Sequence, residues 1–396
     1  MMRRILISAA ILLAGCSGPS NPAAAPEGPP SGARELAFRH TQTFKVYERD
    51  GYRIVDLKAP VIRWGTEAKG QEQAARVVLA PKSMDPPALE GDLAGAMLIR
   101  TPVERIAVNY ATLEAMLTEL GAEDRIVAVG GVKSYNDTIR ARARAGDLAQ
   151  VGYGWHAPPL IDPLIGASPD VFFMVLGDLG HAEHYERIKS LGVPVVPVFF
   201  ESEPHYMGPV DYVGLLGLMT GKEAEGSQFV QMVEENVAAL KARAATQPKK
   251  RVLSAWFAGS GRWMVTVRNL ENALLEDANA ENLMREPDNP RLDATQRMGT
   301  ETLLDRAREA DCWVLRDSHS VAFTDKSVLS NFKAWREGCA FASDGLYKAE
   351  ADAFDIYETG VIRPDLLLAD LTRMLHPELR DAPYVYIQPD TETPQP

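Results

Sequence analysis

The sequence has no apolar stretch long enough to cross a membrane. The apolar run at residues 5–14 is much shorter than the roughly 20 residues that a spanning helix needs. Arg3 and Arg4 precede this run, and small residues follow it up to Cys16. A basic start, a short apolar core and small residues before a cysteine are typical of an export signal, so we expect the chain to leave the cytoplasm.

Cysteine is also scarce, because the 396 residues include only three. Cys312 and Cys339, the two beyond Cys16, lie in no CxxC or metal-ligand spacing, which argues against redox and zinc chemistry. An oxidising compartment permits these two residues to pair, and two buried thiols are the other possibility. The spacing alone leaves both open.

Signatures of catalysis and of nucleic-acid binding are missing as well. The sequence has no GxSxG or HExxH motif, no kinase signature and no glycine-rich phosphate loop. Its net charge is -12, and no Lys- and Arg-rich run carries interleaved aromatic residues. We therefore expect neither an enzyme nor a partner of nucleic acid.

What is present is a chain long enough for two domains. We expect an export signal in residues 1–16, a flexible tether rich in Pro, Ala, Gly and Ser in 17–35, a first lobe in 36–209, a linking helical segment in 210–247 and a second lobe in 248–396.

The pattern within the lobes favours an α/β fold. Alternating stretches between Leu36 and Leu89 predict a short antiparallel β section, with a hairpin in it. Apolar runs then alternate with helical segments, which predicts two doubly wound lobes with mainly parallel sheets. From Lys222 to Ala245 apolar residues recur at helical spacing without proline, so a single long helix is expected to join the lobes. Further helices are expected over 269–284 and 300–308.

Short motifs follow one another in a distinctive order along the chain. They are RIAV at 105–108, LTELGAEDRIVAV at 117–129, SPDV at 168–171, LGVPVV at 191–196, LMTGKE at 218–223, PKKRV at 248–252, PDLLLADL at 364–371 and HPEL at 376–379. In this order they resemble the periplasmic binding proteins of the iron-siderophore, haem and vitamin B12 type, in which one rigid helix joins two α/β lobes. The resemblance covers about Pro102 to Leu379.

This resemblance implies a monomeric substrate-binding lipoprotein of an ABC importer, without an intrinsic cofactor. Such a protein captures a metal chelate, for example a ferric siderophore, haem or a corrinoid, and delivers it to a membrane permease with its ATPase. Cys16 resembles the lipobox cysteine, which implies a lipid anchor in the cell envelope facing the periplasm. By position, Asp162 and Glu301 correspond to the acidic residues that meet arginines of the permease. Both also suit the first turn of a helix, where an acidic residue complements the helix dipole.

In doubly wound sheets, ligands bind beyond the carboxyl ends of the strands, so the loops there are the candidate ligand site. These loops carry aromatic, histidine and arginine residues. The candidates are Tyr135, Trp155, His156, His181, His205 and Tyr206 in the first lobe, and Trp256, Arg262, Trp263, Arg268 and His319 in the second. The indole faces of the two tryptophans would suit a macrocycle or a catecholate, and the arginines could hold carboxylates or phosphates.

The residues leave other functions open. A bare divalent metal could bind through His156, His181, His184 and His205, although their spacing matches no known metal motif. A non-transport enzyme or chelatase on the same scaffold is a second alternative, and a sensor or scaffold lipoprotein is a third.

Overall fold

The computed structural model describes residues 28–62, 70–153, 158–289, 294–315, 325–343, 345–379 and 381–389. Cys16, most of the predicted tether, Trp155, His156 and His319 lie outside the described residues. No helix within the described ranges is long and apolar enough to cross a membrane.

The described chain begins with a five-stranded sheet in the order β1-β2-β3-β4-β5. Its strands are β1 (Arg34–Leu36), β2 (Phe44–Arg49), β3 (Tyr52–Val61), β4 (Gln71–Pro81) and β5 (Met97–Thr101). The first four pair in an antiparallel manner, and β5 is parallel to β4. The predicted antiparallel section is confirmed, and it is larger than the expected hairpin. Asp50 and Gly51, both at positive φ, form the tight turn between β2 and β3.

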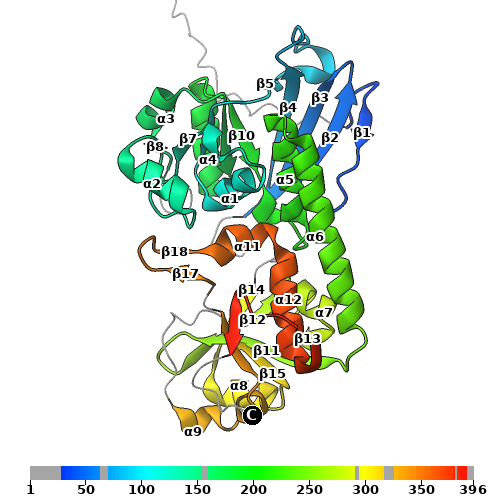
Figure 1. Cartoon of the computed structure of the whole chain (residues 1–396), viewed down its shortest axis with the longest axis vertical. Helices are drawn as coiled ribbons and strands as arrows, with labels where there is room; N and C mark the ends of the chain where they lie inside the picture. The colour runs from blue at the N-terminus through cyan, green and yellow to red at the C-terminus, as the bar shows by residue number, and fades with distance from the viewer. Residues whose placement is uncertain are drawn as a thin grey trace, which may run out of the picture.

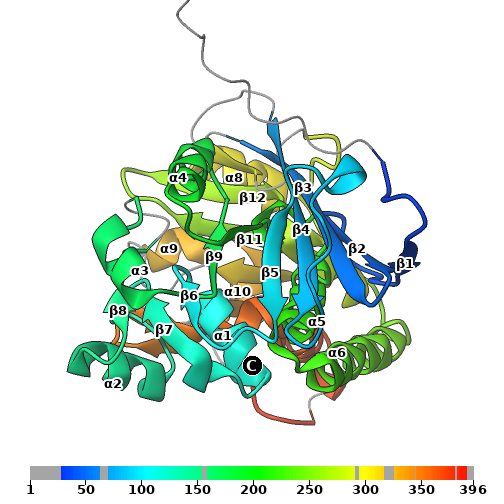
Figure 2. The same cartoon turned by 90° about the horizontal axis from the view of Figure 1, so that it is seen from above.

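The first lobe contains a fully parallel sheet beside this one (Figure 2). Its order is β10 (Val195–Val198), β9 (Val171–Val175), β6 (Ile106–Val108), β7 (Ile126–Val129) and β8 (Ala149–Gln150). Every residue of β9 is buried, as expected of a strand covered on both faces. The covering helices are α1 (Ala111–Glu119), α2 (Asp137–Ala145), α3 (Ile161–Ala167) and α4 (Leu179–Ser190).

Two helices, α5 (Gly208–Thr220) and α6 (Glu223–Ala244), follow the first lobe. The 22 residues of α6 reach about 33 Å at 1.5 Å per residue, and α6 runs along both lobes (Figure 1). The predicted long helix is therefore confirmed. Glycines let α5 and α6 approach closely, since a Cβ on Gly226 would lie 3.2 Å from the Cα of Gly214.

The second lobe has a mixed sheet in the order β14-β12-β11-β15-β16-β19, with β13 paired to β11. Its strands are β11 (Lys250–Phe257), β12 (Arg262–Arg268), β13 (Ala280–Asn282), β14 (Ala294–Gly299), β15 (Cys312–Leu315), β16 (Ala340–Ser343) and β19 (Ile387–Pro389). The central strands β13, β11, β15 and β16 are parallel, whereas β12, β14 and β19 are antiparallel to their neighbours. A disulfide joins Cys312 to Cys339, which resolves the alternative left open above.

The helices of the second lobe are α7 (Leu270–Asp277), α8 (Thr300–Ala307), α9 (Lys326–Leu329), α10 (Lys333–Arg336), α11 (Thr359–Ile362) and α12 (Pro364–Leu375). A small hairpin of β17 (Tyr347–Lys348) and β18 (Ala353–Phe354) precedes α11. The helix expected over 269–284 is wrong in its second half. It ends at Asp277, because Asn279 has φ of 54° and the next residues pair with β11 as β13.

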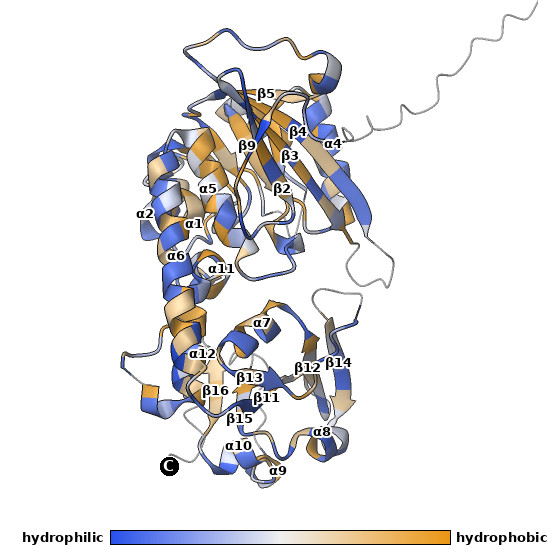
Figure 3. Cartoon of the chain, turned by 90° about the vertical axis from the view of Figure 1, so that its right-hand side faces the viewer, coloured by the Kyte–Doolittle hydropathy of each residue, from blue (hydrophilic) through white to orange (hydrophobic). Residues whose placement is uncertain are grey.

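The two lobes face each other across a gap that α6 spans on one side (Figure 3). The hydropathy colouring of Figure 3 shows mainly hydrophobic strands inside the first lobe and a mixed surface on α6. This arrangement confirms two α/β lobes joined by one long helix. The exact lobe boundaries at residues 209 and 247 stay a prediction.

Candidate functional site

Residues of both lobes line a pocket of about 220 Å³. Tyr206 and Pro209, at the start of α5, line it from above, and the rest of its wall comes from the second lobe. The remaining lining residues are Leu270, Glu271, Leu274, Val314, Ile356, Tyr357, Gly360, Val361, Pro364, Leu367, Leu371 and Ile387. Because both lobes contribute, this pocket is where a ligand would contact both at once.

The pocket wall is mainly apolar and includes no Lys, Arg or His among the lining residues that the structure describes. Glu271 is its one carboxylate, and its Oε1 accepts a hydrogen bond from the Ser254 hydroxyl at 3.3 Å. Such a wall favours an uncharged, apolar part of a ligand, with few polar contacts to orient it.

Tyr206 connects the pocket to the helices that join the lobes. Its hydroxyl donates a hydrogen bond to Asp277 on α7, and Lys241 of α6 lies 2.8 Å from the other carboxylate oxygen of Asp277. Burial and then the Asp277 carboxylate raise the pKa of Tyr206, so this residue keeps its proton. The ring of His205 packs on Tyr206 at 4.3 Å between centroids. Burial lowers the pKa of His205, so its neutral form is favoured although the ring still contacts solvent.

The carboxyl ends of the first-lobe strands hold buried polar groups. Asn109 follows β6 and is completely buried, and neither atom of its amide has a hydrogen-bond partner among the described residues. Tyr110 donates a hydrogen bond to Oε1 of Glu201 at 2.6 Å. Burial raises the pKa of Glu201 to about 7. These residues were not among the candidates predicted from the sequence, although their place after β6 and β10 was a usable signal.

Glu203, two residues beyond Glu201, has a structural role. Its carboxylate accepts hydrogen bonds from the Thr43 hydroxyl and from the backbone of Gln42 and Thr43, so it anchors the segment before β2. A Cβ on Gly208 would lie 2.6 Å from this carboxylate, so only glycine fits at the start of α5.

Tyr153 covers the loop after β7. A Cβ on Gly130 would lie 2.5 Å from the Tyr153 ring, and one on Gly131 would lie 2.9 Å from it. The Tyr153 hydroxyl accepts a hydrogen bond from the backbone N–H of Lys133 at 2.6 Å. Both glycines therefore allow an aromatic ring to lie flat on the edge of the first lobe, a role that the sequence did not reveal.

The structure distributes the predicted ligand residues unevenly. Of the described candidates, Tyr206 lines the pocket and His205 packs on it, whereas Tyr135 contacts the second lobe through Lys348. His181 lies in the first turn of α4, and the half-buried His184 lies in the next turn.

The second-lobe candidates differ in exposure. Trp256 is half-buried near the end of β11, and Arg262 is exposed. Trp263 is completely buried, donates its indole N–H to the Thr300 hydroxyl at 3.0 Å and packs on another tryptophan in the core. In this conformation its indole offers no face to a ligand. Arg268 donates to the carbonyl oxygen of Asn289 within the lobe.

The two predicted docking residues are both exposed. Asp162 lies in the first turn of α3, and Glu301 lies in the first turn of α8. Exposed apolar side chains, Leu160 and Ile165, flank Asp162. The geometry is compatible with a contact surface and also with helix-dipole stabilisation.

Comparison with known proteins gives a consistent result. A family model described as periplasmic binding protein matches residues 106–352. An uncharacterized lipoprotein of Methanocaldococcus jannaschii is 25% identical over 297 residues, which cover 71% of this chain and 67% of that protein.

Solved structures share the fold at low sequence identity. A periplasmic heme-binding protein, RhuT from Roseiflexus sp. RS-1, matches with 18% identity and a TM-score of 0.52, covering 69% of this chain and 98% of that one. The siderophore-binding protein BauB, bound to ferric iron and two acinetobactin molecules, matches with 17% identity and a TM-score of 0.52, covering 69% and 93%. An ABC transporter solute-binding protein from Sulfurospirillum deleyianum matches with 15% identity and a TM-score of 0.53, covering 71% and 86%.

Proposed function

This chain belongs to the periplasmic binding protein family, and from that premise we propose that it is the substrate-binding lipoprotein of an ABC importer for a metal chelate. The proposed cargo is a ferric siderophore, haem or a corrinoid, held between the lobes and passed to a membrane permease with its ATPase. The single observation that carries the proposal is the apolar pocket that residues of both lobes line.

The size of the pocket bears on the kind of cargo. Its volume of about 220 Å³ is below the roughly 300–1,000 Å³ of pockets that enclose a drug-sized ligand. We therefore propose that the pocket holds one apolar part of a larger chelate, such as a ring or an alkyl substituent. The remainder would lie between the lobes, where His205 and Trp256 are the proposed neighbours.

A chelate fits the described residues better than a bare metal ion does. Within the described ranges, no group of three or more His, Cys, Asp or Glu side chains could hold a metal ion. Among the described residues, His205, His181 and His184 therefore belong to no set of three ligands such as a divalent metal needs. A chelate brings its own ligands and needs only shape and a few polar contacts.

The proposed anchor and partner follow from the same premise. Lipidation of Cys16, which lies outside the described residues, would hold the chain in the cell envelope facing the periplasm. Asp162 and Glu301 have no ion-pair partner among the described residues and are the proposed contacts to the permease.

The direct test is to isolate the full chain under native conditions and to record its intact mass and visible absorption spectrum. Ferric siderophores, haem and corrinoids differ in colour and mass, so these measurements distinguish them. We expect the isolated protein to carry one chelate per chain. Protein from which the chelate has been removed should bind the same chelate again. A protein that binds none of haemin, a ferric catecholate and aquocobalamin in titrations would contradict the proposal. Turnover of a bound chelate without a permease would instead favour an enzyme or chelatase.

A further inference from the structure

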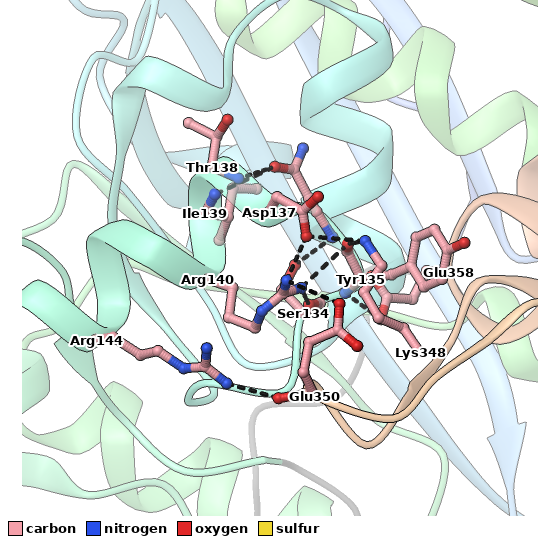
Figure 4. Close-up of polar contacts among 11 residues, drawn as sticks. Ser134, Tyr135, Asp137, Thr138, Ile139, Arg140, Arg144, Lys348, Glu350 and Glu358 are labelled. Atoms are coloured by element: carbon pink, nitrogen blue, oxygen red, sulfur yellow. Dashed lines mark hydrogen bonds and ion pairs between the residues drawn. The ribbon is translucent and has the colours of Figure 1, made fainter.

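A hairpin of the second lobe contacts the first lobe on the side away from α6 (Figure 1). We define the clasp as residues 345–358, which contain β17 and β18 and end where α11 begins. Most of its partners in the first lobe lie within residues 133–144 (Figure 4), and others lie on α1. The lobes are thus tied twice, by α6 on one side and by the clasp on the other.

Lys348 is the one cation of the clasp. Its Nζ donates to the carbonyl oxygen of Tyr135 and to Oδ1 of Asp137, both at 2.8 Å, and lies 4.1 Å from the centroid of the Tyr135 ring. The Lys348 side chain is 18% exposed. Its partner Asp137 is 72% exposed, and in the second ion pair Lys133 and Asp352 are 54% and 60% exposed, so solvent screens both pairs. The buried contacts are those of Lys348 with Tyr135. Lys348 is therefore the stronger tie.

Hydrogen bonds to backbone atoms fix the position of the clasp. Arg144 donates to the carbonyl oxygen of Glu350 at 2.7 Å, and the Thr112 hydroxyl donates to that of Tyr357 at 2.7 Å. These bonds fix the position of the clasp on the first lobe. Their acceptors are backbone carbonyl oxygens, so the bonds do not depend on the charge of any carboxylate in the clasp.

The end of the clasp brings two buried carboxyl groups together. Glu358 is 5% exposed, and its two oxygens accept hydrogen bonds from the backbone N–H of Tyr135 at 2.9 and 3.0 Å. Glu114 of α1 is completely buried, and the Ser134 side chain partly offsets the effect of this burial on its pKa. The charge of Glu114 acts on Glu358. Two carboxylates that interact in a dry interior cannot both ionise without a large penalty.

Burial dominates the protonation of this pair. It raises the pKa of Glu358 to about 8, with the Glu114 charge as the next cause, and it raises the pKa of Glu114 to about 7. The groups that face the pair from neighbouring elements are Ser134 and the Tyr135 N–H before α2, Tyr153 after β8, Lys348 of β17 and Asp355 before α11. Lys348 lowers the pKa of Glu358 and Asp355 raises it, so these two effects oppose each other. Burial and the Glu114 charge are therefore the main causes of the raised pKa of Glu358.

We propose that the clasp is a proton-controlled lock, which holds the lobes at one spacing while the Glu114–Glu358 pair retains a proton and releases them when both carboxyl groups ionise. The proton leaves to solvent on release and returns on closing. Ile356 and Tyr357 belong to the clasp and also line the pocket, so release would remove part of the pocket wall. The proposal that release of the clasp alters the cargo pocket rests on the proposed function.

The test measures the distance between the lobes in cargo-free, full-length protein. Spin labels on D147C and S330C, exposed sites on the first and second lobes, report it by double electron–electron resonance while the native disulfide stays intact. The proposal predicts one narrow distance at pH 6 and an added, longer population at pH 9. An identical distribution at both pH values would overturn it.

Variants separate the pair from the rest of the clasp. The double variant E114Q/E358Q cannot ionise at these positions and keeps hydrogen-bonding groups, so it should show the narrow distance at both pH values. E309Q is the matched control, because Glu309 is an exposed carboxylate of the second lobe outside the clasp, and it should behave as the wild type does. A double variant that responds to pH as the wild type does would refute the lock.

A second variant keeps the proposal testable if the double variant does not fold. K348M removes the buried cation and should show the longer population already at pH 6, whereas a narrow distance there would count against the clasp. Because the protein carries no cargo in these measurements, failure of the lock leaves the proposed function standing. Equally, failure to bind any chelate leaves the distance result unaffected.

Discussion

Single buried residues on the cleft side of the first lobe are sensitive to pH. Glu201 accepts a hydrogen bond from the Tyr110 hydroxyl, and burial raises the pKa of Glu201 to about 7. In the unfolded chain the Glu201 carboxyl has the ordinary glutamate pKa of 4.5. Between these two values the folded protein binds more protons than the unfolded one, so stability must fall as pH rises through this window.

The variant E201Q tests this effect. Between pH 4.5 and pH 8, ionisation of Glu201 should cost the wild type about 2–3 kcal/mol of unfolding free energy. E201Q cannot ionise at this position, so its unfolding free energy should fall by about 2–3 kcal/mol less over the same range. Its amide oxygen still accepts the hydrogen bond from Tyr110, so the contact itself is kept. Denaturant unfolding at both pH values measures the difference. E309Q, at an exposed second-lobe glutamate, is the control. Equal pH slopes for E201Q and the wild type would refute the assignment.

Gly130 tests the close approach of Tyr153. In G130A the new Cβ would lie 2.5 Å from the ring, so Tyr153 must move, and we expect a loss of about 1–3 kcal/mol in unfolding free energy. G166A is the matched control, because a Cβ there meets nothing within 4 Å and alanine favours the helix α3. Thermal unfolding compares the two. A G130A protein as stable as G166A would show that the ring is not held against the loop.

At this scale the sequence predicted some site residues and missed others for physical reasons. Tyr206 was identified because it follows an apolar strand, and it lines the pocket. Trp263 looked equivalent, but its place in β12 points it into the second-lobe core. Glu114 was missed because burial between α1 and the clasp depends on contacts more than 200 residues apart, which no local pattern reveals.

Elements of regular structure were easier to predict than their ends. The long helix was recognised from its apolar spacing, and α6 spans Glu223–Ala244. The start of the predicted linking segment is a separate helix, α5, because Gly221 adopts φ of 71° and ends it. The antiparallel strands β14 and β19 were not foreseen, since each joins its sheet through partners distant in sequence.

A disulfide links two neighbouring segments of the second-lobe sheet. Cys312 of β15 and Cys339 before β16 close a loop with a sequence separation of 27, for which loop-closure entropy predicts about 3–4 kcal/mol of stabilisation. Unfolding with and without reductant measures this contribution. C312A/C339A should unfold like the reduced wild type and should not respond to reductant. A wild-type midpoint that is unchanged by full reduction would contradict the estimate.

At the scale of the whole molecule, two features accompany the two lobes and the long helix. The family match begins at residue 106, so the five-stranded sheet of β1 to β5 lies before it. The clasp adds a second connection between lobes that α6 already joins (Figure 1). The overall two-lobed fold was predictable from the order of motifs, whereas the clasp was not, because its contacts join distant segments.

Docking to a permease is a prediction about the outer surface. Reversing the charge of either acidic residue, in D162K or E301K, should lower chelate import by cells at least tenfold and leave chelate affinity unchanged, since such charges orient the encounter. D305K is the matched control, an 82% exposed carboxylate on the same helix as Glu301. Import assays beside binding titrations separate the two effects. Unchanged import in both variants would remove these residues from the docking surface.

The central claim is that the apolar pocket between the lobes holds part of a chelate. The most direct measurement is a tryptophan-fluorescence titration of the wild type, L270R and L191R with the chelate recovered from native protein. Leu270 lines the pocket and Leu191 is an exposed residue elsewhere on the first lobe. A guanidinium in this wall would have to be desolvated by the cargo, so we expect L270R to weaken affinity at least tenfold and L191R to match the wild type. Equal affinity in all three proteins would contradict the claim.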